Sequence, residues 1–130
     1  ALTLARFYDM YVGPINRYDR RGNLIETKNT DASFNYSKDD VVNWVKEKYD
    51  VDLYKKPQWA LMSRSPTPFP HYMLRFLDKN GTPIVYSIDA RDGSLIFQNI
   101  GGVKTKFKDD SIWYPKKNEK KKEVRTRHLK

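Results

Sequence analysis

Residues 72–98, YMLRFLDKNGTPIVYSIDARDGSLIFQ, contain three short strand-like segments that are separated by two turn signals. Along the first two segments successive side chains alternate between two sets, as they do on a strand with two different faces. The first turn signal is DKNG at residues 78–81, in which Asn-Gly tolerates positive φ at both central positions. The second is RDG at residues 91–93. This stretch therefore predicts an antiparallel β-meander.

Upstream of the meander, residues 37–53 predict a helix. Ser37 is a suitable N-cap, and Asp39 and Asp40 fall in the first turn, where the helix dipole favours acidic side chains. Apolar residues recur at i, i+3 and i+4 and define one face of the helix. We expect Trp44 to anchor that face against the sheet.

Further strands are expected on both sides of the helix and the meander. Residues 58–63 (QWALMS) predict a short strand, and residues 104–113 contain a last edge strand, TKFKD. The alternating prolines of residues 65–70 predict a stiff extended connector, with a ligand for an aromatic groove as the alternative. Residues 15–27 predict a hairpin, and the polar residues 28–37 a loop.

The N-terminal residues 1–11, ALTLARFYDMY, place apolar side chains at helical spacing, so they predict an amphipathic helix of about three turns. Gly-Pro at residues 13–14 would end this helix. Either it packs on the core of the domain, or it docks on a partner or a membrane surface. The side chains of the possible docking face are Leu4, Phe7, Tyr8 and Tyr11.

The sequence of the meander carries a recognisable motif. Its residues are Asn80-Gly81, Ile84, Tyr86, Ile88, Asp89-Ala90, Asp92-Gly93 and Leu95. With them, residues 37–98 resemble the PepSY domain, a small module of bacterial envelope proteins and of the pro-regions of secreted metalloproteases. The resemblance implies a helix on an antiparallel sheet and a non-catalytic regulatory or binding role outside the cytoplasm. The acidic, aromatic helix and the proline-rich insertion depart from the family pattern.

The net charge of +9 is concentrated near the C-terminus. From Lys104 onward there are 11 basic and four acidic residues, and residues 116–130 alone hold eight basic and two acidic ones. The cations of this basic tail are Lys116, Lys117, Lys120, Lys121, Lys122, Arg125, Arg127 and Lys130. Such a tail neutralises phosphates of nucleic acid, docks on anionic lipid, binds a protein partner, or only keeps the chain soluble.

Side chains suited to catalysis or metal binding are sparse. The chain has no cysteine, and His71 and His128 are far apart, without the spacing of metal ligands. Asp19, Asp78 and Asp92 lie at turns, where aspartate commonly accepts hydrogen bonds from backbone amides. We therefore expect no enzyme, no cofactor, no metal and no small-molecule ligand.

Together these observations predict an α+β fold: one helix packed on a small antiparallel β-meander, with an N-terminal helix and a basic C-terminal tail. Residues 1–115 would form a single domain, with residues 37–98 as its PepSY-like core and residues 116–130 as the tail. The expected function is a non-catalytic binding or scaffold subunit of a bacterial envelope or secreted assembly. The alternatives are a nucleic-acid-associated accessory protein and a protease inhibitor or intramolecular chaperone.

Overall fold

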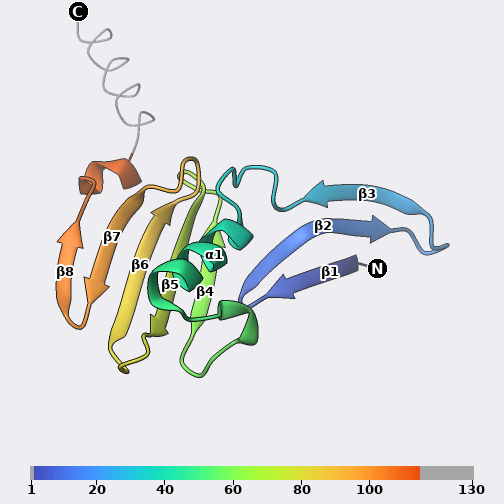
Figure 1. Ribbon diagram of the computed structural model, residues 1–130. Coiled ribbons are helices and arrows are strands. Elements are labelled where there is room, and N and C mark those ends of the chain that lie inside the picture. The colour runs from blue at the N-terminus through green and yellow to red at the C-terminus, as the bar shows by residue number, and fades with distance from the viewer. Residues whose placement is uncertain (1, 115–130) are drawn as a thin grey trace, which may run out of the picture.

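The computed structural model describes residues 2–114, which form two antiparallel sheets and one α-helix (Figure 1). The first sheet contains β1 (Leu2–Phe7), β2 (Met10–Tyr18) and β3 (Leu24–Asn29). The second, in the order β4-β5-β6-β7-β8, contains β4 (Leu61–Ser65), β5 (His71–Leu77), β6 (Pro83–Asp89), β7 (Leu95–Ile100) and β8 (Val103–Lys106). The helix α1 (Lys38–Tyr49) and the 3-10 turn η1 (Leu53–Lys55) connect the sheets, and η2 (Asp110–Trp113) follows β8. The predicted α+β class is confirmed.

One face of the five-stranded sheet forms the core together with α1, which lies across it (Figure 1). The buried side chains of this face are Met62, Tyr72, Leu74, Phe76, Ile84, Tyr86 and Ile88. The helix covers them with three buried valines, Val41, Val42 and Val45. Trp44 is only half-buried, and its ring meets the ring of Tyr86 edge-on with 4.7 Å between centroids. The valines, rather than the expected tryptophan, therefore occupy the centre of the contact.

Helix α1 begins as its sequence predicts. The hydroxyl of Ser37 accepts the backbone N–H of Asp40, and the Asp40 carboxylate accepts the backbone N–H of Ser37, so both halves of a capping box are present. The helix ends at Tyr49, earlier than expected, because Asp50 adopts a left-handed conformation with φ of 55°. The next buried apolar residue, Leu53, then belongs to η1.

The meander of residues 72–98 is present as β5, β6 and β7, and its two turns lie where the sequence places them. In the first turn Asp78 Oδ1 accepts the backbone N–H groups of Asn80 and Thr82. In the second turn the backbone N–H of Gly93 donates to the carbonyl of Asp89 at 2.7 Å. Both turns are therefore closed by local hydrogen bonds that aspartate and glycine make possible.

The predicted N-terminal helix is wrong, because residues 2–18 form the hairpin β1–β2. The chain reverses at Tyr8, which has φ of 54°, and Pro14 continues into β2 opposite Asn29 of β3. The spacing of apolar residues in this segment fits a helical face, but pairing of β1 with β2 satisfies the backbone of both strands, and β3 extends the sheet on the other side of β2. The residue spacing within a short stretch of sequence does not reveal such pairing.

Other boundaries differ less from expectation. The strand expected at residues 58–63 is shifted to Leu61–Ser65, since Trp59 has φ of 68° and Ala60 donates to the carbonyl of Pro57 in a turn. The hairpin of residues 15–27 is confirmed as β2–β3, although β3 runs on to Asn29. The prolines of residues 65–70 lie in the connector before β5, and β8 is the last edge strand.

Gly93 offers a test of the second turn. Its φ is +80°, and a Cβ at this position would lie 2.6 Å from the ring of Tyr36. We expect Gly93→Ala to lower the free energy of unfolding by at least about 2 kcal/mol, because a left-handed alanine costs about 1–2 kcal/mol before any clash. Urea unfolding followed by circular dichroism measures this loss.

Gly22, in the β2–β3 turn, is the matched control, with φ of +85° and open space around its Cβ position. Gly22→Ala should cost only the backbone strain of a left-handed alanine, about 1–2 kcal/mol, without the added clash. Equal losses in the two variants would show that the Tyr36 ring moves aside freely.

Candidate interaction site

The sheet β1–β3 projects from the rest of the molecule, and we refer to residues 2–29 as the arm (Figure 1). All six residues of β3 are exposed, and no helix or second sheet covers the outer part of the arm within the described residues. Apolar side chains on the arm lie in solvent: Leu4 is 47%, Tyr11 47%, Leu24 56% and Ile25 54% exposed. Exposed apolar side chains gathered on one projecting element are typical of an interaction surface.

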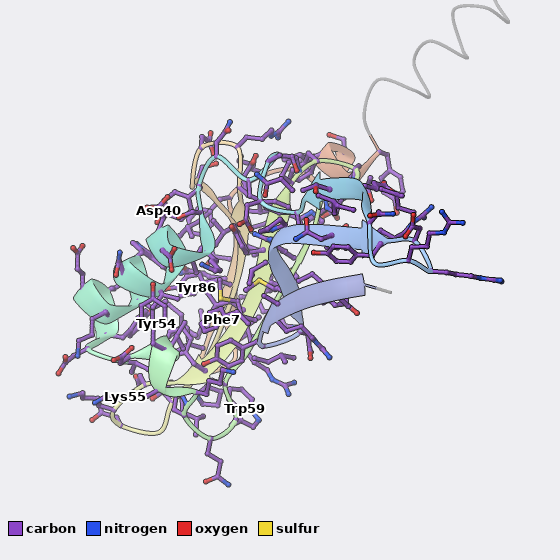
Figure 2. The ribbon with its side chains drawn as sticks, turned by 90° about the vertical axis from the view of Figure 1, so that its right-hand side faces the viewer. Phe7, Asp40, Tyr54, Lys55, Trp59 and Tyr86 are labelled. Carbon is purple, nitrogen blue, oxygen red and sulfur yellow. The ribbon has the colours of Figure 1, made fainter. Side chains whose placement is uncertain are left out.

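The root of the arm is tied to the core. Met10, at the start of β2, is 2% exposed, and the backbone N–H of Asp9 donates to the Met62 carbonyl of β4 at 3.4 Å. The Tyr8 hydroxyl donates to the carbonyl of Leu53 at 2.5 Å. Figure 2 shows Phe7 lying close to Tyr54 of η1, with 5.8 Å between the ring centroids. The arm is therefore attached at one end and free along the rest of its length.

Arg64 of β4 joins the arm to the five-stranded sheet. Its side chain is 5% exposed, and its guanidinium donates to Asp31 Oδ1 at 2.6 Å and to the Tyr11 carbonyl at 2.7 Å. The guanidinium also stacks on the ring of Phe34, 4.3 Å from its centroid. One buried cation thus binds β4, β2 and the β3–α1 loop at the same point, and we call these contacts the Arg64 joint.

Asp31 is the acidic partner in the Arg64 joint. Its other oxygen, Oδ2, accepts the backbone N–H of Gly13 in β2 at 2.9 Å. Burial favours the neutral acid, but the hydrogen bonds from Arg64 and Gly13 outweigh it and lower the pKa of Asp31 below its usual value. The carboxylate therefore stays ionised and holds both the arm and the guanidinium.

A pocket of about 460 Å³ lies beside this joint, between the arm and the body. Its lining includes Met10, Tyr11, Asn29, Phe34 and Arg64. Apolar rings and a buried cation therefore border a hollow at the base of the arm, where a partner in contact with the arm would also reach the body.

The predicted docking residues do not form one face. Leu4 and Tyr11 are exposed on the arm, whereas Phe7 and Tyr8 are half-buried and pack on the core. Since the segment is a hairpin, the two pairs separate into an outer and an inner set. The basic tail, residues 116–130, lies outside the described residues.

The aspartates expected at turns act as turn formers. Asp19 Oδ1 accepts the backbone N–H groups of Arg21 and Asn23, and Asp92 Oδ1 accepts that of Ser94. Backbone hydrogen bonds, first that from Asn23, lower the pKa of Asp19. The interpretation of these residues as turn formers is confirmed.

Asp89 is a buried charged residue whose role the sequence does not reveal. It is 1% exposed, and its carboxylate accepts hydrogen bonds from Arg91 at 2.8 Å and from Lys108 Nζ at 2.9 Å. Burial works against ionisation, but the two cations hold the pKa of Asp89 far below its usual range. Its place at the end of a buried strand is the signal that could have marked it. Lys108, 19 residues away, could not be paired with it from sequence.

The histidine and the aromatic residues of the meander occupy structural positions. His71 begins β5, and its Nδ1–H donates to the Phe69 carbonyl at 2.8 Å. The aromatic rings of Tyr72, Phe76 and Tyr86 are fully buried in the core, whereas Phe97 of β7 is only half-buried on the opposite face of the sheet. Within residues 2–114, no group of three His, Asp or Glu side chains is placed to hold a metal ion.

Comparisons with known proteins found no relatives. No protein-family model, curated protein or solved structure matches the chain. In the described part of the chain, no helix has the length and apolar character required to cross a membrane. The candidate site therefore rests on the geometry of the arm and of the Arg64 joint.

Arg64→Met tests the joint. It keeps most of the packing volume but leaves the Asp31 carboxylate and two carbonyl groups without their donor. Because Asp31 retains contact with water, we expect a loss of about 1–3 kcal/mol in unfolding free energy. We also expect faster hydrogen exchange in β2 and β3, measured by mass spectrometry.

Arg17→Met is the control, because its ion pair with Glu26 is exposed on the arm. It should change stability by less than about 0.5 kcal/mol. Unchanged exchange in β2 and β3 of the Arg64 variant would contradict the proposed role of the joint.

The lowered pKa of Asp89 predicts that the stability of the fold depends on pH. Since its pKa is lower in the folded chain than in the unfolded one, its contribution is complete above about pH 4 and is lost as the pH falls further. Asp89→Asn should cost about 1–3 kcal/mol at pH 7 and progressively less below pH 4. Urea titrations at several pH values measure the difference. Asp110→Asn, at an exposed pair with Lys106, should show almost no difference at any pH.

Proposed function

We propose that this chain is a non-catalytic binding module that attaches to a protein partner through the arm. The observation that carries the proposal is the arm itself, a three-stranded sheet on which Leu4, Tyr11, Leu24 and Ile25 are exposed to solvent. A small sheet without a covered face gains little stability from its own packing. A bound partner would bury Leu24, Ile25 and their neighbours, and this burial would supply the stabilisation that the sheet lacks on its own.

The Arg64 joint supports this function because it fixes the direction of the arm before any partner binds. An element that is already ordered loses less conformational entropy on association than a flexible segment does. The exposed aliphatic and aromatic side chains of the arm favour a protein surface over nucleic acid, which is recognised mainly through phosphates. The adjacent pocket would accept part of the same partner.

The remaining parts of the chain fit the same role. We assign α1 and β4–β7 to a PepSY-like unit, supported by their order along the chain and by the turn at residues 89–93. This resemblance favours an envelope or secreted assembly and keeps a protease inhibitor as an alternative. In the proposed module the basic tail provides a second, electrostatic contact with the partner, with nucleic acid as the alternative target.

The arm is tested with the variant Leu24→Asp/Ile25→Asp as bait in affinity capture from cells that produce the chain. Both residues are exposed, so circular dichroism should show unchanged folding. We expect recovery of the specific protein partner to fall by at least about tenfold, because two buried apolar contacts are lost. The purified partner should show the same loss by calorimetry.

Val103→Asp is the matched control, since Val103 is 70% exposed on β8, away from the arm. Full recovery by the arm variant would refute the role of the arm. A wild-type bait that captures only nuclease-sensitive material would support the nucleic-acid alternative. A chain that ends at Pro115 then shows whether the basic tail is responsible.

A further inference from the structure

The five-stranded sheet has a second face, opposite α1, which we call the open face. Alternation along the strands directs one set of side chains away from the core, and the strand register aligns them across β4 to β8. Two neighbouring rows result: one runs through Leu61, Arg75, Val85, Asn99 and Lys104, and the other through Ser63, Met73, Ser87, Phe97 and Lys106. This face is distinct from the arm, and a ligand bound to it would be independent of the function proposed for the arm.

The open face is more apolar than a solvent-facing sheet requires. An antiparallel sheet with one covered face normally carries polar side chains on the other. Here Met73 is 41% and Leu77 38% exposed, and Leu61, Val85 and Phe97 are half-buried, with only the short η2 crossing part of this face in the described chain. An uncovered apolar strip of this kind indicates a binding surface.

A pocket interrupts the strip where η2 crosses the open face. The Trp113 ring of η2 stacks on Phe69 and meets His71 edge-on, with centroid distances of 5.1 and 4.8 Å. Beneath it lies a cavity of about 170 Å³, enough for one side chain. It is lined by Met73, Ser87, Ile96, Phe97, Lys106, Lys108, Asp110 and Trp113, so the wall carries one carboxylate beside its two ammonium groups.

Ser87 points to a ligand for this pocket. The residue is 2% exposed, and among the described residues its hydroxyl has no hydrogen-bond partner. A buried hydroxyl without a partner costs about 1–3 kcal/mol. An acceptor atom placed in the pocket by a ligand would remove this cost.

The cations around the strip define the charge of that ligand. Lys106 pairs with Asp110, and Lys108 Nζ donates to both Asp89 and Ser94, so each ammonium keeps at least one further donor for a ligand in the pocket. Lys104 on β8 and Arg75 on β5 form no ion pair within residues 2–114. The basic tail of the chain has the same sign of charge and would be repelled, so the complement is an acidic segment of another chain.

We propose that the open face binds an acidic, partly apolar segment of a partner protein. One carboxylate side chain enters the pocket, accepts a hydrogen bond from Ser87 and is held by Lys106 and Lys108. Apolar side chains of the same segment lie along Met73 and Val85. A protein segment is favoured over single-stranded nucleic acid because the strip is mainly aliphatic, and Trp113 and Trp59 already contact Phe69 and Arg75.

The methionines provide a direct test. The chain has three, and Met73 alone lies on the open face, whereas Met10 and Met62 are buried in the core. Methyl NMR of ¹³C-methionine-labelled protein is recorded with a synthetic peptide of about 10 residues, the length of a strand, in which glutamate alternates with valine or leucine. The Met73 methyl signal should shift with saturation, and those of Met10 and Met62 should not.

Variants separate the contributions of the pocket and the charges. Ser87→Ala should weaken peptide binding about fivefold and leave thermal stability unchanged or higher, because the removed hydroxyl has no partner in the free protein. Lys104→Glu should weaken binding by a similar factor. Lys55→Glu makes the same charge change at an exposed position of η1 beside α1, where Figure 2 labels it, and should have no effect.

Three results would overturn the proposal. The first is an unchanged Met73 signal at about 1 mM peptide, a concentration that reveals even weak binding. The second is equal binding of a peptide with lysine in place of glutamate. The third is tighter binding of oligo-dT than of the acidic peptide, which would identify the face as a nucleic-acid surface instead.

Discussion

A single helix covers one face of a five-stranded sheet and leaves most of the other face uncovered. This unequal burial sets the size of the core and the amount of apolar surface that stays exposed. The 12 residues of α1 place three valines on the aromatic and aliphatic side chains of β4–β6. The helix cannot reach the other face, and η2 covers only one end of it. The chain therefore has a small, well-packed core and more uncovered apolar surface than its size would suggest.

Arg64 holds the arm in place, which the small core does not do by itself. The arm has too few buried residues to hold its own position, since among residues 4–29 only Met10 is fully buried. A buried guanidinium with partners on three segments supplies the missing directional contacts, and Asp31 neutralises its charge. Ion pairs of this kind add little net stability but strongly disfavour other arrangements, because a displaced arm would leave the buried cation unpaired.

Features held by contacts between close neighbours in the sequence could be predicted, whereas those held by contacts between distant residues could not. The turns at residues 78–81 and 91–93 and the cap at Ser37 depend on hydrogen bonds between close neighbours, so their residue types reveal them. The N-terminal hairpin depends on pairing between β1 and β2, from Phe7 with Met10 out to Leu2 with Arg17, whereas a local window contains only helical spacing. The Arg64–Asp31 pair joins residues 33 apart, and only the folded chain brings it together.

The arm and the pocket under η2 lie at different places along the five-stranded sheet. The arm is attached beside β4, whereas the pocket is lined by residues of β5 to β8. With strands about 4.8 Å apart, roughly 10 Å separates β4 from the middle of the pocket. A partner that occupied both would have to extend across the open face, and the second contact would form at the high effective concentration set by the first. Local hydrogen bonds close the turns of the meander between them, and its paired strands set this distance.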